Sequence, residues 1–257
     1  MSVLEFAEVV AREAAARALS YYQERESLVV ERKQPLDLVT AADREVERLI
    51  RERVRQAFPE DAFFGEESTR ELSSTGRTWV IDPIDGTLNF VRGIDDWAVS
   101  IGVLEHGRPI AGVVALPARG VQVAGGPFYG ARCNGAELTA PTDQGPRDVV
   151  VGIGLFASTL LEDQLAVVRG LGALGYSFRR NGSTSVSLTM LARGQLDGFV
   201  ALDVAAWDFA AGVAIVEALG YSCSLDWRRV NLFERIRLAC ALPSLLAPLR
   251  SLIETSP

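Results

Sequence analysis

Trp79-Val80-Ile81-Asp82-Pro83-Ile84-Asp85-Gly86-Thr87-Leu88-Asn89-Phe90 is the stretch around which the chain is organised. It begins as a short apolar run, which is typical of a buried strand. Pro83 separates the two aspartates and restricts Asp82 to an extended conformation. Gly86 allows close approach to a ligand, and the amides that follow it would point at an anion. Carboxylates for a hard cation beside amides for a phosphate predict a metal-assisted phosphate site, and the whole arrangement disfavours an ordinary Asp-rich turn.

Composition narrows the class of protein. The 257 residues are 48% hydrophobic and carry a formal net charge of −7. These values predict a globular protein with a large core, and no apolar run approaches the ~20 residues of a membrane span. The acidic balance, without a Lys/Arg cluster, argues against nucleic-acid binding, so an anionic substrate would need metal ions as local positive charge. The N-terminal residues lack a signal-peptide pattern, and we expect a soluble, cytoplasmic protein.

Cysteine and histidine usage excludes several kinds of site. Cys133, Cys223 and Cys240 are odd in number and lack C-x-x-C spacing, which disfavours both a disulfide framework and a zinc site. His106 is the single histidine and lies in a polar turn. A Ser-His, Cys-His or multi-His mechanism would depend on that one residue, and its turn-like context disfavours this.

The first 60 residues predict two helices. Residues 2–24 show amphipathic helical spacing, and residues 28–32 indicate a strand or hairpin arm. Thr40 is a good N-cap for a second helix that Phe58-Pro59 ends, and Asp43 stands where a capping-box acid would. Asp43 has two interpretations at this stage: an acid that complements the helix dipole, or a member of a site.

Two adjacent acids follow the next predicted strand. Glu66 and Glu67 come directly after Asp61-Ala62-Phe63-Phe64-Gly65. Neighbouring like charges repel, so such a pair is either solvated in a loop or neutralised by a cation. The glycine at the strand end repeats the arrangement of the central stretch and favours the cation.

The remaining pattern predicts two halves. Four short strands (97–104, 109–115, 120–123 and 127–132) indicate a mostly antiparallel sheet covered by the two helices. Residues 140–148 resemble a linker, so we predict an N-terminal α+β domain over 1–140 and a C-terminal α/β domain over 141–257. In the second half, strands at 149–151, 176–179 and 197–202 alternate with helices at 158–171, 183–192, 206–219 and from 243 onward.

Asp208 is the acid in the second half that suggests chemistry. It lies in the first turn of an apolar, Ala-rich helix after Trp207. An acid that complements the helix dipole is one interpretation. A nearby cation is the other, because it would make a charge tolerable in such an apolar helix. Together with Glu66, Asp82, Asp85 and the Ile84 carbonyl, Asp208 would suffice for two or three Mg²⁺ ions, with Thr87 orienting water or holding a phosphate oxygen.

The chain resembles the inositol monophosphatase family of Mg²⁺-dependent, lithium-sensitive phosphatases. Three motifs carry the resemblance, in this order: Gly65-Glu66-Glu67-Ser68, Asp82 to Thr87, and Trp207-Asp208. The similarity extends from Asp37 to Gly220. The resemblance implies an α/β fold, a layered αβαβα five-layer sandwich, usually dimeric. It also implies Mg²⁺ as cofactor (two or three ions), with Mn²⁺ as a substitute and Ca²⁺ and Li⁺ as inhibitors.

The resemblance also implies roles for site residues. The metal ligands would be Glu66, Asp82, the Ile84 carbonyl, Asp85 and Asp208. Asp43 and Glu67 would be supporting catalytic acids, and Asp43 would polarise the Thr87 hydroxyl that helps to activate water. Gly86 and Thr87 amides would bind phosphate. On the substrate side the candidates are Asp203, Asp208 and the segment that contains Arg180 and Gly182, although a solvated Arg179-Arg180 pair is an equal alternative.

Departures from the family pattern concern the substrate. Inositol-cleaving members carry a Glu seven residues before the Asp of Trp-Asp, and Ala201 stands there in this chain. Either Asp203 substitutes for that Glu or the alcohol is not inositol. The basic residue upstream of the first motif is either Lys33 or Arg32.

The expectation is a phosphomonoesterase that acts on a small polyol or sugar phosphate, inositol 1-phosphate first. The alternatives are histidinol phosphate, fructose 1,6-bisphosphate and 3′-phosphoadenosine 5′-phosphate as substrates, or a regulatory binding protein on the same fold.

Overall fold

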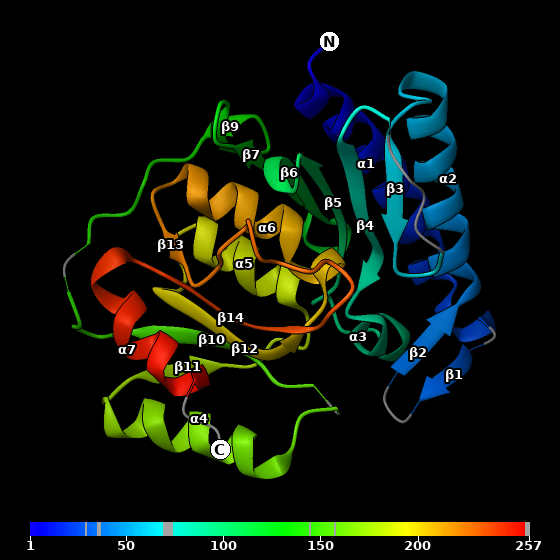
Figure 1. Cartoon of the computed structure of the whole chain (residues 1–257). Helices are drawn as coiled ribbons and strands as arrows, with labels where there is room; N and C mark the ends of the chain where they lie inside the picture. The colour runs from blue at the N-terminus through cyan, green and yellow to red at the C-terminus, as the bar shows by residue number, and fades with distance from the viewer. Residues whose placement is uncertain (29, 35–36, 69–73, 144, 157, 255–257) are drawn as a thin grey trace.

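Five layers of secondary structure stack in the order helix, sheet, helix, sheet, helix (Figure 1). The computed structural model describes residues 1–28, 30–34, 37–68, 74–143, 145–156 and 158–254, without the side chains of residues 27, 32–34 and 37–39. The layered α/β sandwich expected from the sequence is confirmed. Within the described residues, no helix is long and apolar enough to cross a membrane.

The first layer consists of α1 (Val3–Gln23) and α2 (Ala41–Ala57). Both begin with a capping box, in which Ser2 pairs with Glu5 and Thr40 pairs with Asp43. The apolar stripes of the two helices pack against the large sheet, as their periodicity predicts. Between the helices lie the short 3₁₀ turn η1 (Arg25–Ser27) and a hairpin of β1 (Val30–Gln34) and β2 (Asp37–Thr40).

The large sheet has seven strands in chain order, and all neighbours except the first pair are antiparallel. The strands are β3 (Ala62–Gly65), β4 (Arg77–Asp85), β5 (Ala98–Glu105), β6 (Arg108–Leu116), β7 (Val121–Gly126), β8 (Gly130–Cys133) and β9 (Ala136–Glu137). Strands β3 and β4 are parallel, with Gly65 opposite Ile81. Their carboxyl ends therefore meet at one edge, which brings Glu66 beside Asp82.

Two short helices flank strands of this sheet. Helix α3 (Thr87–Arg92) follows β4 directly, and Gly86 precedes it in a left-handed conformation (φ 94°). The 3₁₀ turn η2 (Pro117–Arg119) connects β6 to β7. The predicted antiparallel strands of the first half are thus present: β6 and β7 are longer than the sequence indicated, β8 is shorter, and β5 is shifted by one residue.

The central layer is formed by α5 (Thr184–Ala192) and α6 (Ala206–Ala218), which are buried on nearly all sides. Helix α6 contacts β5 and β6 through two glycines that lie opposite each other, Gly102 and Gly112. A Cβ on Gly112 would lie 2.1 Å from the carbonyl oxygen of Ala211. Helix and sheet therefore touch backbone to backbone at this point, because neither strand has a side chain there.

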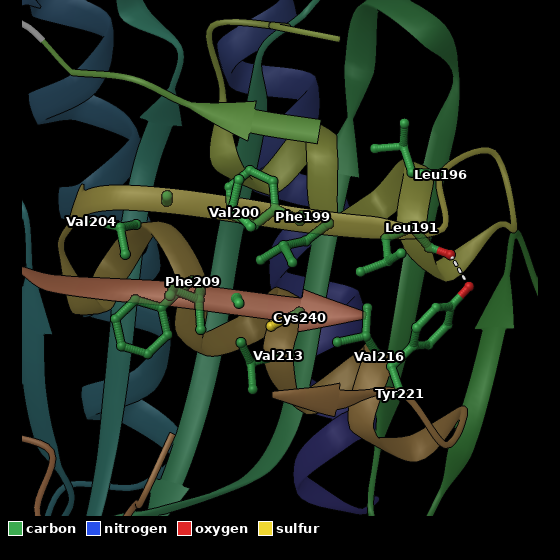
Figure 2. Packing of buried hydrophobic residues seen from close by; sticks show 14 of the residues in the cluster. Leu191, Leu196, Phe199, Val200, Val204, Phe209, Val213, Val216, Tyr221 and Cys240 are labelled. Atoms are coloured by element: carbon green, nitrogen blue, oxygen red, sulfur yellow. Dashed lines mark hydrogen bonds between the residues drawn. The ribbon is translucent and has the colours of Figure 1, made fainter. Parts of the chain in front are cut away.

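The small sheet has the strand order β11-β10-β12-β14-β13. Its strands are β10 (Val150–Gly154), β11 (Ser177–Arg179), β12 (Gly198–Val204), β13 (Ser222–Cys223) and β14 (Ile236–Ala241), and its outer face carries α4 (Leu161–Ala173) and α7 (Pro243–Glu254). Figure 2 shows the side chains that fill the space between this sheet and the central helices, where the buried Tyr221 hydroxyl donates a 2.7 Å hydrogen bond to the Leu191 carbonyl.

Element boundaries in the second half differ modestly from the sequence expectation. The helix predicted to start at Ser158 begins at Leu161, and Leu160 supplies no side-chain cap. From residue 138 to 149, the described residues form neither helix nor strand. The predicted division into domains 1–140 and 141–257 stays a prediction.

Candidate active site

Three buried carboxylates form the centre of the candidate site. Asp82 and Asp85 come from the end of β4, and Asp208 comes from the first turn of α6. One carboxylate oxygen from each of the three residues can be chosen so that all three oxygens lie within 4.8 Å of one another. All three side chains are less than a tenth exposed. Residues more than 120 positions apart in the sequence are thus brought within reach of one small cation.

The electrostatics of this cluster favour a cation. Burial raises the pKa of Asp82 well above its ordinary value, and the charges of Glu66, Asp85 and Asp208 raise it further. Burial, and next the charge of Asp85, raises the pKa of Asp208 to about 7. These buried carboxylates repel one another when they are ionised, and a bound cation would remove that repulsion. Their oxygens are ligands of the kind that hard cations prefer. Such a set fits a divalent ion of the Mg²⁺ type.

Backbone amides hold each of these aspartates in place. The Ile84 amide donates to Asp82 Oδ1 (3.0 Å), within an irregularity of β4 between the two aspartates. The Ser185 amide at the start of α5 donates to Asp85 Oδ2 (2.5 Å), and the Ala205 amide donates to Asp208 Oδ2 (2.9 Å). These bonds fix the orientation of the three carboxylates towards one another.

Asp43 and Thr87 meet beside the cluster. The amide and the hydroxyl of Thr40 both donate to Asp43 Oδ2 at 2.7 Å. The Thr87 hydroxyl lies 3.5 Å from Asp43 Oδ1 and 3.1 Å from the Ile84 carbonyl oxygen. Burial, partly offset by the Thr40 bonds, raises the pKa of Asp43 to about 6. The capping-box interpretation of Asp43 is therefore correct, and the same side chain also faces Thr87.

Glu47 is a buried acid that sequence reasoning missed. Its Oε2 accepts the Glu67 amide at 2.8 Å, and a Cβ on Gly65 would lie 2.3 Å from that oxygen. Arg51 is its ion-pair partner at 3.7 Å, and burial raises the pKa of Glu47. Glu47 follows Asp43 by one helical turn on α2, so a search for acids at i and i+4 would have found it. Glycine at position 65 leaves the room for this carboxylate under the Glu66-Glu67 turn.

A cavity of about 530 Å³ opens over the acidic cluster, between the end of β4 and the second half of the chain. Gly86 borders it, but the space that its missing side chain leaves is taken by the Asp96 carbonyl and Ser183. The cavity is lined by Glu66, Asp82, Ile84, Asp85, Gly86, Thr87, Leu88, Asn89, Ile153, Gly154, Leu155, Phe156, Ser158, Arg180, Asn181, Gly182, Ser183, Thr184, Trp207, Asp208 and Arg235.

The substrate-side candidates separate into two groups. Arg180 and Gly182 border the cavity, whereas Asp203 does not, and its carboxylate accepts the Ser158 hydroxyl. Ala201 is buried and packs towards Gly154 on the neighbouring strand. A substrate contact by Asp203 therefore stays a prediction. Arg235 borders the cavity and was missed, because it lies in a polar stretch without a pattern.

The candidates for an upstream basic residue, Lys33 and Arg32, have side chains that lie outside the described part of the structure. Glu67 follows Glu66 at the end of β3, where its amide is bound by Glu47. The candidates Glu66, Ile84, Thr87, Asp82, Asp85 and Asp208 all border the cavity.

The sequence of this chain is similar to those of known proteins. The sequence profile of the inositol monophosphatase family matches residues 1–251. Inositol-1-monophosphatase of Rhizobium meliloti is 34% identical over 209 residues, which cover 80% of this chain and 79% of that protein. Nus factor SuhB of Pasteurella multocida is 35% identical over 228 residues, which cover 87% of this chain and 85% of that protein.

Solved structures show the same fold. The extragenic suppressor protein suhB from Bartonella henselae superposes with a TM-score of 0.91 at 26% identity, over 100% of both chains. Mycobacterium tuberculosis SuhB superposes with a TM-score of 0.81 at 30% identity, over 98% of both chains.

Proposed function

The chain belongs to the inositol monophosphatase family and is a phosphoric monoester hydrolase, and from this premise we propose that it is an Mg²⁺-dependent phosphatase of small polyol or sugar phosphates. Inositol 1-phosphate is the reference substrate. The observation that supports the proposal best is the set of three buried carboxylates under an open cavity. Such a set is costly to the fold unless a cation neutralises it.

Two or three Mg²⁺ ions would be held by Glu66, Asp82, the Ile84 carbonyl, Asp85 and Asp208. When bound, Mg²⁺ supplies positive charge to the phosphoryl oxygens and lowers the pKa of water at neutral pH. We expect Mn²⁺ to substitute for it, and Ca²⁺ and Li⁺ to inhibit. Asp208 would serve both ion and substrate, because it borders the cavity from the second half of the chain.

Thr87 and Asp43 would position the attacking water. Asp43 is fixed by its two bonds from Thr40 and keeps Oδ1 for the Thr87 hydroxyl. When Thr87 donates to that oxygen, its lone pairs are left for a water molecule in the cavity. Glu67 would assist as a second acid near the reacting water, held by the bond from its amide to Glu47. The amides of Gly86 and Thr87 would receive phosphate oxygens at the start of α3.

The test is phosphate release from inositol 1-phosphate, histidinol phosphate, fructose 1,6-bisphosphate and 3′-phosphoadenosine 5′-phosphate, with and without Mg²⁺. We expect release from at least one ester only with the metal, and loss of release in Asp82→Asn. Absence of turnover on the whole panel, or undiminished turnover in Asp82→Asn, would contradict the proposal.

A regulatory role beside catalysis is the second candidate. The relative named Nus factor SuhB favours it, because that name describes a factor rather than an enzyme. The complete acid cluster argues against a chain that has lost catalysis. Complementation of a deletion strain by Asp82→Asn separates the two roles, since a regulatory role survives this substitution. We also expect a homodimer, which sedimentation would test.

A further inference from the structure

Two arginines, Arg180 and Arg235, also line the cavity over the acidic cluster. Arg180 precedes α5 and Arg235 precedes β14, and both border the cavity that the carboxylates also border. Both side chains are exposed on the cavity rim, although the chain as a whole is acidic. The lining residues Leu155 and Phe156, which the two arginines contact, and the neighbouring Ser158 carry no charge.

Both arginines are held by neutral acceptors. Arg180 Nη2 donates to the Leu155 carbonyl (3.0 Å), and Arg235 Nη1 donates to the Asp203 carbonyl (3.2 Å). Within the described ranges of the chain, no carboxylate forms an ion pair with either guanidinium. A hydrogen bond to a carbonyl oxygen orients a guanidinium group but does not neutralise it. Its charge and its other N–H groups therefore stay available to a ligand.

The carboxylate of Asp203, whose main chain binds Arg235, is itself bound to another side chain. Its carboxylate accepts the Ser158 hydroxyl, and only its main-chain oxygen binds Arg235. The guanidinium of Arg235 lies 5.9 Å from the Phe156 ring centroid, which supports it on the cavity side.

We propose that the alcohol released by this enzyme carries a second anionic group, a phosphate or a carboxylate, which Arg180 and Arg235 bind. This inference rests on the proposed phosphatase function and names the substrate class of the same site. Ala201 is buried and offers no hydrogen-bonding group to sugar hydroxyls, whereas two fixed guanidinium groups suit a planar or tetrahedral anion. A neutral polyol would offer neither guanidinium an anionic ligand.

Matched pairs of esters test the proposal. Fructose 1,6-bisphosphate is compared with fructose 1-phosphate, and 3-phosphoglycerate with glycerol 3-phosphate, so that each pair differs in one anionic group. We expect kcat/KM to favour the anionic member of at least one pair by about 10- to 100-fold, which is the usual effect of a hydrogen bond to a charged group. The favoured pair identifies the group as phosphate or carboxylate.

Substitution shows whether the arginines cause the preference. Arg180→Gln and Arg235→Gln should each lower the ratio of kcat/KM within the favoured pair by about tenfold. The inhibition constant of the retained product, such as fructose 6-phosphate, should rise equally. Arg179→Gln is the matched control, because Arg179 is exposed next to Arg180, donates to the Phe178 carbonyl and does not border the cavity.

Equal kcat/KM within both pairs, or a preference that survives both substitutions, would overturn the proposed second anion while leaving the phosphatase function intact. No phosphate release from any of the four esters or from inositol 1-phosphate would overturn the phosphatase function and this inference with it.

Discussion

Helices α2 and α6 both begin with an aspartate in the first turn, and we assign different roles to the two aspartates. Each has an aspartate in its first turn that accepts the amide three residues before it, from Thr40 to Asp43 and from Ala205 to Asp208. Helix α2 is amphipathic and its aspartate is also bound by the Thr40 hydroxyl, whereas α6 is buried and Ala205 offers no side chain. The two helices thus share one capping bond, and the surroundings separate the proposed positioning role of Asp43 from the proposed ion-binding role of Asp208.

The largest expected effect comes from Asp208. Asp208→Asn keeps the oxygen that accepts the Ala205 amide but removes the negative charge, so we expect kcat/KM to fall by about 1,000-fold or more. The metal-free protein should at the same time become more stable by about 5 °C at pH 8, because a buried charge is lost. Steady-state kinetics and thermal unfolding measure both.

Asp43→Asn should stabilise the metal-free protein less than Asp208→Asn does, because the two bonds that Thr40 donates to Asp43 offset part of the cost of burying its charge. If both asparagine variants gave the same change in melting temperature, the proposed difference between α2 and α6 would be wrong.

The next effect concerns the pair of Asp43 and Thr87. Asp43→Asn and Thr87→Val should each lower kcat by about 100-fold, because each breaks the same hydrogen bond that orients water. The double variant should lose little more than either single variant, since residues that act as a unit are not additive. If the loss of kcat in the double variant equalled the product of the two single losses, Asp43 and Thr87 would act independently.

Glu47 should have a smaller effect. Glu47→Ala removes the acceptor of the Glu67 amide, and we expect kcat/KM to fall about tenfold with a higher Mg²⁺ requirement. Glu47→Gln keeps an acceptor oxygen and should restore most of the activity. Glu52→Gln is the control on the same helix, because Glu52 is exposed and pairs with Arg48. Equal losses in the Ala and Gln variants would contradict a role through that hydrogen bond.

The smallest effect is the pH dependence of metal-free stability. Asp208 has a pKa of about 7 in the folded chain, above its ordinary value, so the folded state binds more protons than the unfolded state between these values. Stability is therefore greatest below the ordinary pKa and falls as pH rises through about 7, by about 1.4 kcal/mol between pH 6 and 8. Asp82 and Asp85 face Asp208 and add to the fall, whereas Arg235 opposes it.

Denaturant unfolding of the metal-free protein at several pH values measures this slope. Saturating Mg²⁺ should flatten it, because a cation favours the ionised form of the cluster. A slope that is unchanged by Mg²⁺ would argue that the ion binds elsewhere.

Most of the fold could be predicted because each element carries its own pattern. The parallel pairing of β3 and β4 brings together two strand ends that share the pattern of apolar run, glycine and acids, so the meeting of Glu66 with Asp82 followed from local signals. Asp208 was found because a charge is conspicuous in an apolar helix.

Other parts of the site depend on contacts that no local pattern encodes. Glu47 acts through an amide 20 residues away, and Arg235 reaches a cavity whose other walls come from distant strands. Asp203 lies two residues from Ala201, but its carboxylate is bound to Ser158 and it does not border the cavity. Which way a side chain at a strand end turns is decided by the packing of neighbouring elements.

The glycine pair under α6 has a consequence for how the site tolerates mutation. Gly102 and Gly112 let the backbone of α6 rest on the sheet, and α6 carries Asp208 while the neighbouring strand β4 carries Asp82. The separation of these two carboxylates therefore depends on contact between two main chains, which a change of side-chain rotamer cannot alter. Substitutions on the cavity rim can therefore change substrate preference without moving these carboxylates, whereas a side chain added at Gly102 or Gly112 would change the distance between them.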